Sequence, residues 1–357
     1  MQLERRTQSS PAMLLGAPLL AVVATLLITS LLVAWAGAPV GQAYALLLEG
    51  GFGSRFAWTE TLTRATPLIL TGLAAAVAFK ARLYNIGGEG QLYAGAIAAV
   101  AVGGLHGGAG FGAPTWVLFP LMMLAAATAG ALLLLGPALL KSRLGVDEVV
   151  TTLLLNFIVL LGVSALLDGP MKDASAMGWP QSVAIADRLQ LSQLIERGRV
   201  HTGLLWALAL APTLWALLAF TTTGFEIRAV GANARAAGFA GMPVAWVTVK
   251  VALLSGALAG LAGAIEVAGR AGYVTLDMSP GYGSSGVVIA MLAALNPLGV
   301  VAAAVFVAGI LVGADSMSRA VGVPTYIADV IVAVSLVTML IATLLTQYRM
   351  RFDRSRR

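Results

Sequence analysis

The chain has 357 residues, of which 59% are hydrophobic and 11% are charged, and its formal net charge is +6. These proportions exclude a soluble globular protein and indicate an integral membrane protein, in which the excess positive charge marks inner loops and not a nucleic-acid surface. The sequence has no cysteine and two histidines, which excludes disulfides, thiolate metal sites and histidine metal clusters, so we predict neither a metal nor another cofactor.

Apolar runs that are long enough, or nearly long enough, to cross a bilayer predict an all-α polytopic membrane protein with about ten transmembrane segments and broken helices. Residues 1–60 are predicted to hold an uncleaved first helix and then an external or interfacial segment broken by glycines. Residues 61–346 form the predicted core and residues 347–357 a basic tail, all within one transmembrane domain. The predicted spans are 13–36, 66–79, 91–105, 116–135, 149–166, 204–220, 244–268, 284–295, 298–314 and 326–345.

Residues 168–202 form a long hydrophilic loop, and residues 189–200 within it carry apolar side chains at helical spacing. This stretch is predicted to be a short amphipathic segment on the outer surface that docks a partner, or else a disordered linker. Lysine and arginine number 13 in the predicted inner segments and eight in the outer segments. That bias predicts an even number of spans with both termini in the cytoplasm.

The segment Asn85–Gln91, which we call the first break, places three glycines and three polar side chains between two apolar runs. Glycine lowers helix propensity, and polar side chains are costly in hydrocarbon unless they find partners. Irregular backbone at membrane depth is tolerated where it is buried in protein or lines a wet cavity, so the first break is predicted to line a transport path. The alternative is a cytoplasmic turn, because Lys80 and Arg82, which are typical inner charges, stand just upstream.

A second glycine-rich segment, Gly281–Gly286, interrupts the other half of the chain, and we call it the second break. Paired interruptions are typical of transporters in which two related halves surround one path, so an internal two-fold repeat is predicted. The second break has the spacing G-x-G-x-x-G, but no strand precedes it and no acid follows about 20 residues later, which argues against dinucleotide binding. The sequence has no Walker A loop, and we predict a protein that is not an enzyme and does not itself hydrolyse ATP.

Residues 224–242 are predicted to be cytoplasmic and to contain a helix of about two turns over 234–240. Asn233 is a good N-cap, and Gly241 is a good residue to follow the C-terminal end. A helix this short is unstable alone and therefore needs a partner. Arg235 and Phe239 share one face and could present a charge and a ring to a socket. The alternative is a loop helix that packs on its own bundle.

Five motifs, in order along the chain, resemble the permease subunits of bacterial ABC importers for nucleosides and related simple sugars, a family of ribose-type and branched-chain amino acid-like permeases. The motifs are Tyr84–Gln91, Val146–Asn156, Phe225–Ala237, Asn296–Gly299 and Gly313–Arg319. The resemblance implies a multi-pass permease of the bacterial inner (plasma) membrane. It would move a nucleoside or related simple sugar inward while a partner subunit hydrolyses ATP.

The resemblance also implies partners and site residues. The implied partners are a cytoplasmic ABC ATPase, a second and homologous permease chain, a periplasmic or lipoprotein substrate-binding protein and membrane lipid, with no nucleic acid. The candidate residues along the substrate path are Asn85, Glu89, Gln91 and Asn156, with Glu266 near the outer end of a span as a further candidate. The residues implied in ATPase coupling are Arg228, Gly231, Asn233, Arg235, Phe239 and Gly241.

The chain departs from the pattern of these permeases in three places. Where relatives commonly have Asn-Pro-Glu, it has Asn233-Ala234-Arg235, which keeps the cap and changes the charge offered to an ATPase. Ser284 and Ser285 stand where a larger or acidic residue is common, and Val332 stands where a glutamine is common. The identity of the solute is therefore open.

Two other classes of function fit parts of the sequence. A secondary transporter coupled to protons would use Glu89, Glu266 or Asp329 as its relay. A membrane enzyme that acts on a lipid carrier fits less well, because the long outer loop has neither a carboxylate cluster nor metal-ligand spacing.

Overall fold

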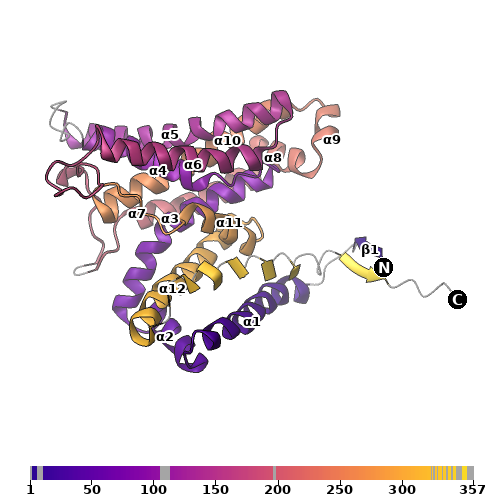
Figure 1. Ribbon diagram of the computed structural model, residues 1–357. Coiled ribbons are helices and arrows are strands. Elements are labelled where there is room, and N and C mark those ends of the chain that lie inside the picture. The colour runs from indigo at the N-terminus through magenta and orange to yellow at the C-terminus, as the bar shows by residue number, and fades with distance from the viewer. Residues whose placement is uncertain are drawn as a thin grey trace. The chain divides into compact units, whose positions relative to one another are not determined.

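The computed structural model (Figure 1) describes residues 2–5, 11–104, 113–195, 198–322 and 348–351, together with scattered positions between 324 and 342. Apolar runs in these ranges form helices. A single π-helical stretch, Val267–Ala271, continues α10, and Asp187–Leu189 form one 3-10 turn. The α-helices are α1 (Pro11–Trp35), α2 (Val40–Phe52), α3 (Arg55–Lys80), α4 (Gly88–Gly103), α5 (Thr115–Leu144), α6 (Glu148–Asp168), α7 (Gly203–Phe220), α8 (Thr222–Ala232), α9 (Ala234–Phe239), α10 (Val244–Glu266), α11 (Tyr282–Leu292) and α12 (Pro297–Val321).

Six of the described helices are long and apolar enough to cross a membrane, namely α3, α5, α6, α7, α10 with its π-helical continuation, and α12. Helices α1 and α2 form a further apolar pair that is bent by 116°. The predicted spans 91–105 and 284–295 are the shorter helices α4 and α11, and the predicted span 326–345 lies partly outside the described residues. The prediction of an all-α polytopic membrane protein is confirmed, while the described residues contain fewer full-length spans than ten.

The smaller of two compact units comprises Met1–Ala57 and Gly309–Arg357. Within it, Gly51 does not break the chain as predicted for residues 39–60, because it lies inside α2, where a Cβ atom would overlap the backbone carbonyl of Gly309 in α12. The glycine therefore permits close packing of two helices. A short antiparallel pair of strands, β1 (Gln2–Arg5) and β2 (Tyr348–Arg351), brings the two ends of the chain together and is the described exception to the all-α fold.

The larger unit comprises Trp58–Ala308 and is built around α3 and α10. The most apolar window of α3 is 83% buried and that of α10 is 78% buried, whereas that of α6 is only 11% buried. Helix α10 approaches α4 and α5 through small residues, since a Cβ atom on Gly260 would overlap the carbonyl oxygen of Ala126 and one on Gly95 would overlap that of Gly260. Helix α6 exposes large apolar side chains such as Phe157 and Leu161, as a lipid-facing helix does.

The prediction of an amphipathic helical segment over residues 189–200 is wrong. Leu189 ends the 3-10 turn, the described residues after it form no helix, and an isolated bridge joins Gln193 to His201. The Leu191 amide donates to the Ala268 carbonyl oxygen over 2.8 Å, and the Leu194 amide donates to Val200. These bonds take the place of helical bonds, and Leu191 is buried without a helical face.

Candidate functional site

The first and second breaks lie against each other inside the larger unit, at the points where α4 and α11 begin. A Cβ atom on Gly88 would lie 3.2 Å from the carbonyl oxygen of Gly283, so the two backbones are in direct contact. The Glu89 carboxylate accepts a 2.6 Å hydrogen bond from the Gly283 amide. Glu89 thus occupies the N-terminal end of α11, where unpaired amides and the helix dipole favour a negative charge.

The contacts of α11 with α3 show how deep this meeting point lies. The Thr71 hydroxyl donates to the Tyr282 carbonyl oxygen over 2.9 Å, and Thr71 precedes the end of α3 by nine residues, or about 13 Å of helix. At the other end of α11, the Lys80 amine donates to the Leu295 carbonyl oxygen over 3.4 Å. Helix α11 therefore covers only the last part of α3 and begins in the interior of the bundle.

The first break is interior as well, which decides against a turn at the end of the bundle. The Asn85 amide nitrogen donates to the Ser255 hydroxyl over 3.2 Å, and that hydroxyl donates to the Ala74 carbonyl oxygen over 2.8 Å. Ala74 stands six residues, or about 9 Å of helix, before the end of α3. Residues 81–87 therefore run from the end of α3 back into the interior of the bundle, where α4 begins.

Asn85 and Gln91 hold the first break in shape. Their amides pair with each other, with 2.9 Å from Asn85 to Gln91 and 2.8 Å in the reverse direction, and the Asn85 carbonyl oxygen also accepts from the Gly87 amide. Both side chains are buried. Asn156 of α6 completes the support, because it accepts from the Gly90 amide over 2.7 Å and donates to the Ile86 carbonyl oxygen over 3.0 Å. Three of the predicted path residues thus use their polar groups within the protein.

Glu266, the fifth predicted path residue, belongs to a separate group of charges at the end of α10. The Arg270 guanidinium donates to one Glu266 carboxylate oxygen over 2.8 Å and to the Tyr282 hydroxyl over 3.3 Å. Glu266 is fully buried, and its second carboxylate oxygen has no hydrogen-bond partner among the described residues. Arg64 of α3 adds electrostatic attraction to this carboxylate. Side chains from two different helices therefore contact the start of α11: Glu89 at the Gly283 amide and Arg270 at the Tyr282 hydroxyl.

Sequence reasoning missed Arg270 and Tyr282. The spacing of Glu266 and Arg270, four residues apart, is the signal that could have found the ion pair. No such signal exists for Tyr282, which reaches Arg270 only through the folded chain.

Another ion pair, Glu60 with Arg199 at 3.5 Å, joins the start of α3 to the long loop.

The predicted coupling segment forms as expected. Asn233 accepts a 3.1 Å hydrogen bond from the Ala236 amide at the start of α9, and Gly241 has the left-handed φ of +83° that was expected after the helix. Phe239 is 94% exposed, and Arg235 is exposed as well. Gly231 lies in α8, and a Cβ atom there would overlap the Lys80 carbonyl oxygen, so α8 rests directly on the end of α3. We call this end of the larger unit, where α3 and α5 end and α10 begins, the coupling face, after the role that is predicted for α9.

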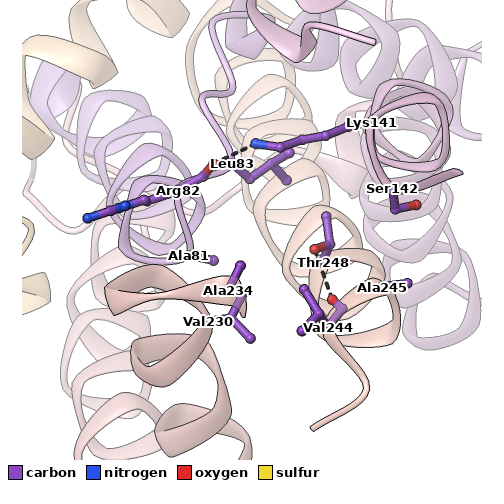
Figure 2. Close-up of a pocket in the computed structure, with 10 residues that line it drawn as sticks. All are labelled: Ala81, Arg82, Leu83, Lys141, Ser142, Val230, Ala234, Val244, Ala245 and Thr248. Carbon is purple, nitrogen blue, oxygen red and sulfur yellow. Dashed lines mark hydrogen bonds between the residues drawn. The ribbon is translucent and has the colours of Figure 1, made fainter. Parts of the chain in front are cut away.

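A cavity of about 480 Å³ opens on the coupling face beside α9 (Figure 2). Its wall is largely apolar, and Lys141 crosses one side, where its amine donates to the Arg82 carbonyl oxygen over 2.7 Å and pairs with Glu148. Figure 2 shows the Arg82 guanidinium directed away from this cavity. The lining residues are Ala81, Arg82, Leu83, Lys141, Ser142, Val230, Ala234, Val244, Ala245 and Thr248.

Comparison with known proteins gives concordant results. The family model for the permease component of branched-chain amino acid transport systems matches residues 57–343. A guanosine ABC transporter permease protein of Bacillus subtilis is 36% identical over 337 residues, which is 94% of each chain. A glucose ABC transporter permease protein of Haloferax volcanii is 37% identical over 367 residues, covering 99% of this chain and 95% of the relative. A nucleoside ABC transporter permease protein of Lactococcus lactis is 30% identical over 325 residues, covering 88% of each.

Proposed function

From the premise that this chain belongs to the family of permease components of branched-chain amino acid transport systems, we propose that it imports a nucleoside through the bacterial inner membrane. Its partners in this proposal are a cytoplasmic ABC ATPase that hydrolyses ATP, a second permease chain and a substrate-binding protein. Both termini and the coupling face are then cytoplasmic. Two of the relatives reported above carry a nucleoside or guanosine in their names and one carries glucose, so the choice of a nucleoside needs a direct test.

The observation that carries the proposal is the meeting of the two breaks around Glu89. In transporters, broken helices whose N-terminal ends face a common point near the middle of the membrane form solute sites. Here the Gly283 amide supplies a donor and Glu89 supplies an acceptor. A neutral solute rich in hydroxyl and amino groups can replace this bond without bringing a charge into the bundle. A nucleoside has that chemistry.

The roles of the predicted path residues follow from their contacts. We assign Glu89 to direct contact with the solute, because its partner is an amide that a solute can take over. Asn85, Gln91 and Asn156 are assigned to holding the first break, since each is bonded to that segment. Glu266 is assigned to fixing the start of α11 through Arg270 and Tyr282.

Transport in reconstituted vesicles tests this function. The chain, assembled with its second permease, ATPase and binding protein, is expected to take up radiolabelled guanosine only when ATP is present. Glu89→Gln is expected to lower uptake roughly ten-fold or more, because hydrogen bonds to a charged group contribute about 1.5–3 kcal/mol. Glu49→Gln is the matched control, because Glu49 is an exposed carboxylate of α2.

Three results would contradict the proposal. Uptake of glucose without guanosine would reassign the solute. Uptake that a protonophore abolishes and ATP depletion leaves intact would indicate a proton-coupled transporter. Equal uptake by the Glu89 and Glu49 variants would remove Glu89 from the solute site.

The coupling segment is proposed to be the ATPase contact. Asn233→Ala removes the cap of α9 and is expected to weaken ATPase binding several-fold, since an N-cap contributes about 0.5–2 kcal/mol. Asn233→Asp keeps a capping oxygen and is expected to bind normally. Affinity for the purified ATPase measures both, and equal binding by all three chains would refute the assignment.

A further inference from the structure

The coupling face carries a second hollow, of about 440 Å³, which shares Arg82 with the lining of the first cavity. We call it the basic pocket, and its volume lies within the range of about 300–1,000 Å³ that is usual for small-molecule sites. Three of its lining side chains are cationic, from the end of α3, the segment that follows it and α8. No carboxylate lines it. The lining residues are Phe79, Lys80, Arg82, Tyr84, Arg228, Gly231, Ala232, Met291 and Leu295.

Two lysines on the same face have acidic partners, which the cations of the basic pocket lack among the described residues. Lys141 pairs with Glu148, and Lys250 pairs with Glu226 at 3.2 Å. Among the described residues, neither Lys80 nor the two arginines of the pocket forms an ion pair with a carboxylate. Lys80 has a 3.4 Å bond to the Leu295 carbonyl oxygen, and it is close enough to Arg228 for the two charges to repel each other.

The pocket wall is fixed by bonds that do not use these charges. Arg82 has a left-handed φ of +55°, which is uncommon for a residue with a side chain, and the Lys141 amine holds its carbonyl oxygen at 2.7 Å. The Tyr84 amide donates to Glu148 over 3.1 Å, and the Tyr84 ring packs edge-on against Phe79 at 5.3 Å between centroids. The Arg82 guanidinium points away from the first cavity (Figure 2). Three like charges thus line a hollow whose backbone wall is supported by these bonds.

We propose that the basic pocket binds a phosphate group. Arginine and lysine around one hollow match the oxygens of a phosphate, and a bound anion offsets the mutual repulsion of the cations. The preference for positive charge on the inner side accounts for basic residues at helix ends. It does not account for the meeting of three cations in one hollow that no carboxylate lines. The phosphate comes either from an anionic lipid, as in other basic pockets between transmembrane helices, or from a soluble phosphate ester.

Binding to the purified full-length chain distinguishes the two sources. One arm uses nanodiscs of phosphatidylcholine with or without phosphatidylglycerol, and counts retained lipid by native mass spectrometry. The other arm titrates guanosine monophosphate, with guanosine as the control that lacks phosphate. The variants are Arg228→Gln and Arg82→Asn, because asparagine tolerates the left-handed backbone at position 82. Arg143→Gln is the matched control, since it removes an exposed cation at the end of α5, outside the pocket.

The expected result is specific retention of phosphatidylglycerol or specific binding of guanosine monophosphate, weakened about ten-fold or more in both pocket variants and unchanged in the control. Retained lipid would identify a lipid phosphate, and nucleotide binding a soluble one. The proposal is overturned if neither ligand binds better than its control. It is also overturned if Arg143→Gln loses as much as the pocket variants, or if the pocket variants lose only ATPase binding. Because the pocket variants are compared with Arg143→Gln, a loss of binding confined to the pocket variants is separate from binding of guanosine at the proposed solute site.

Discussion

Replacing Gly283 with alanine tests whether contact between the two breaks is essential. A Cβ atom there would lie 2.5 Å from the Cα atom of Glu89, whereas carbon atoms in ordinary contact are about 3.5–4.0 Å apart. Helices α4 and α11 would therefore have to separate by about 1 Å. The obstructing atoms are backbone, so no side-chain rotation relieves the overlap. The same separation would stretch the 2.6 Å hydrogen bond between Glu89 and the Gly283 amide beyond bonding distance.

The overlap and the lost hydrogen bond together determine how much stability and uptake Gly283→Ala should lose. Overpacking costs about 1–3 kcal/mol, and loss of a hydrogen bond to a charged group costs about 1.5–3 kcal/mol. Since separating the helices trades one cost for the other, we expect a loss of about 2–3 kcal/mol and at least a ten-fold fall in ATP-dependent uptake. Thermal unfolding in lipid nanodiscs and vesicle uptake measure the two effects.

The matched control is Gly162→Ala in α6. A Cβ atom there meets nothing within 4 Å, and alanine favours a helix over glycine by about 0.5–1 kcal/mol, so this variant should be as stable as the parent or more stable. If Gly283→Ala unfolds and transports like Gly162→Ala, the two breaks do not need direct contact and the proposed site is misplaced.

Three further predictions concern other parts of the larger unit. Thr71→Val removes the hydrogen bond to the Tyr282 carbonyl oxygen and is expected to lower the amount of solute moved per ATP hydrolysed by several-fold. The control, Thr66→Val, loses only a bond within α3 and should leave that ratio unchanged. Arg270→Gln is expected to destabilise the protein by about 3–5 kcal/mol, because it leaves the buried Glu266 carboxylate without its cation. Glu266→Gln is expected to destabilise it by less, because Arg270 is partly exposed and can be hydrated. Thermal unfolding measures both variants, and the reverse order would refute this prediction. Burial lowers the pKa of His201 from 6.5 to about 4, so the unfolded chain binds the proton first as the pH falls. The free energy of unfolding should therefore decrease by about 3 kcal/mol as the pH falls from 6.5 toward 4. His201→Gln should flatten that part of the stability profile, and an unchanged slope would contradict the assignment.

Local chemistry made some elements predictable from the sequence. The capping side chain of Asn233 and the left-handed preference of glycine at position 241 mark the two ends of α9, and neither depends on contacts with distant parts of the chain. The breaks could be located because glycines and polar side chains stand out against apolar runs. Their contact with each other could only be suggested, since residue-level similarity between them is weak.

Other features depend on partners that no local pattern contains. The predicted second span began at residue 66, whereas α3 begins at Arg55, because polar residues near its start lower the hydropathy there. Thr63 is buried with its hydroxyl bonded to the Thr59 carbonyl oxygen one turn earlier, which satisfies it inside the bundle. Glu89 was found as a polar residue in an unusual place, but its role at the end of α11 needed Gly283, which is 194 residues away.

Helix α3 connects the two proposed sites within the larger unit. At its end, the Lys80 carbonyl oxygen leaves no space for a side chain at position 231 of α8. Nine residues earlier, Thr71 is bonded to the first residue of α11. Because α3 is mostly buried and closely packed, we expect a displacement of α8 against Lys80 to be passed along the helix. The start of α11 would then move relative to α4, which is held by Asn85, Gln91 and Asn156, and that is the movement needed to open the contact around Glu89.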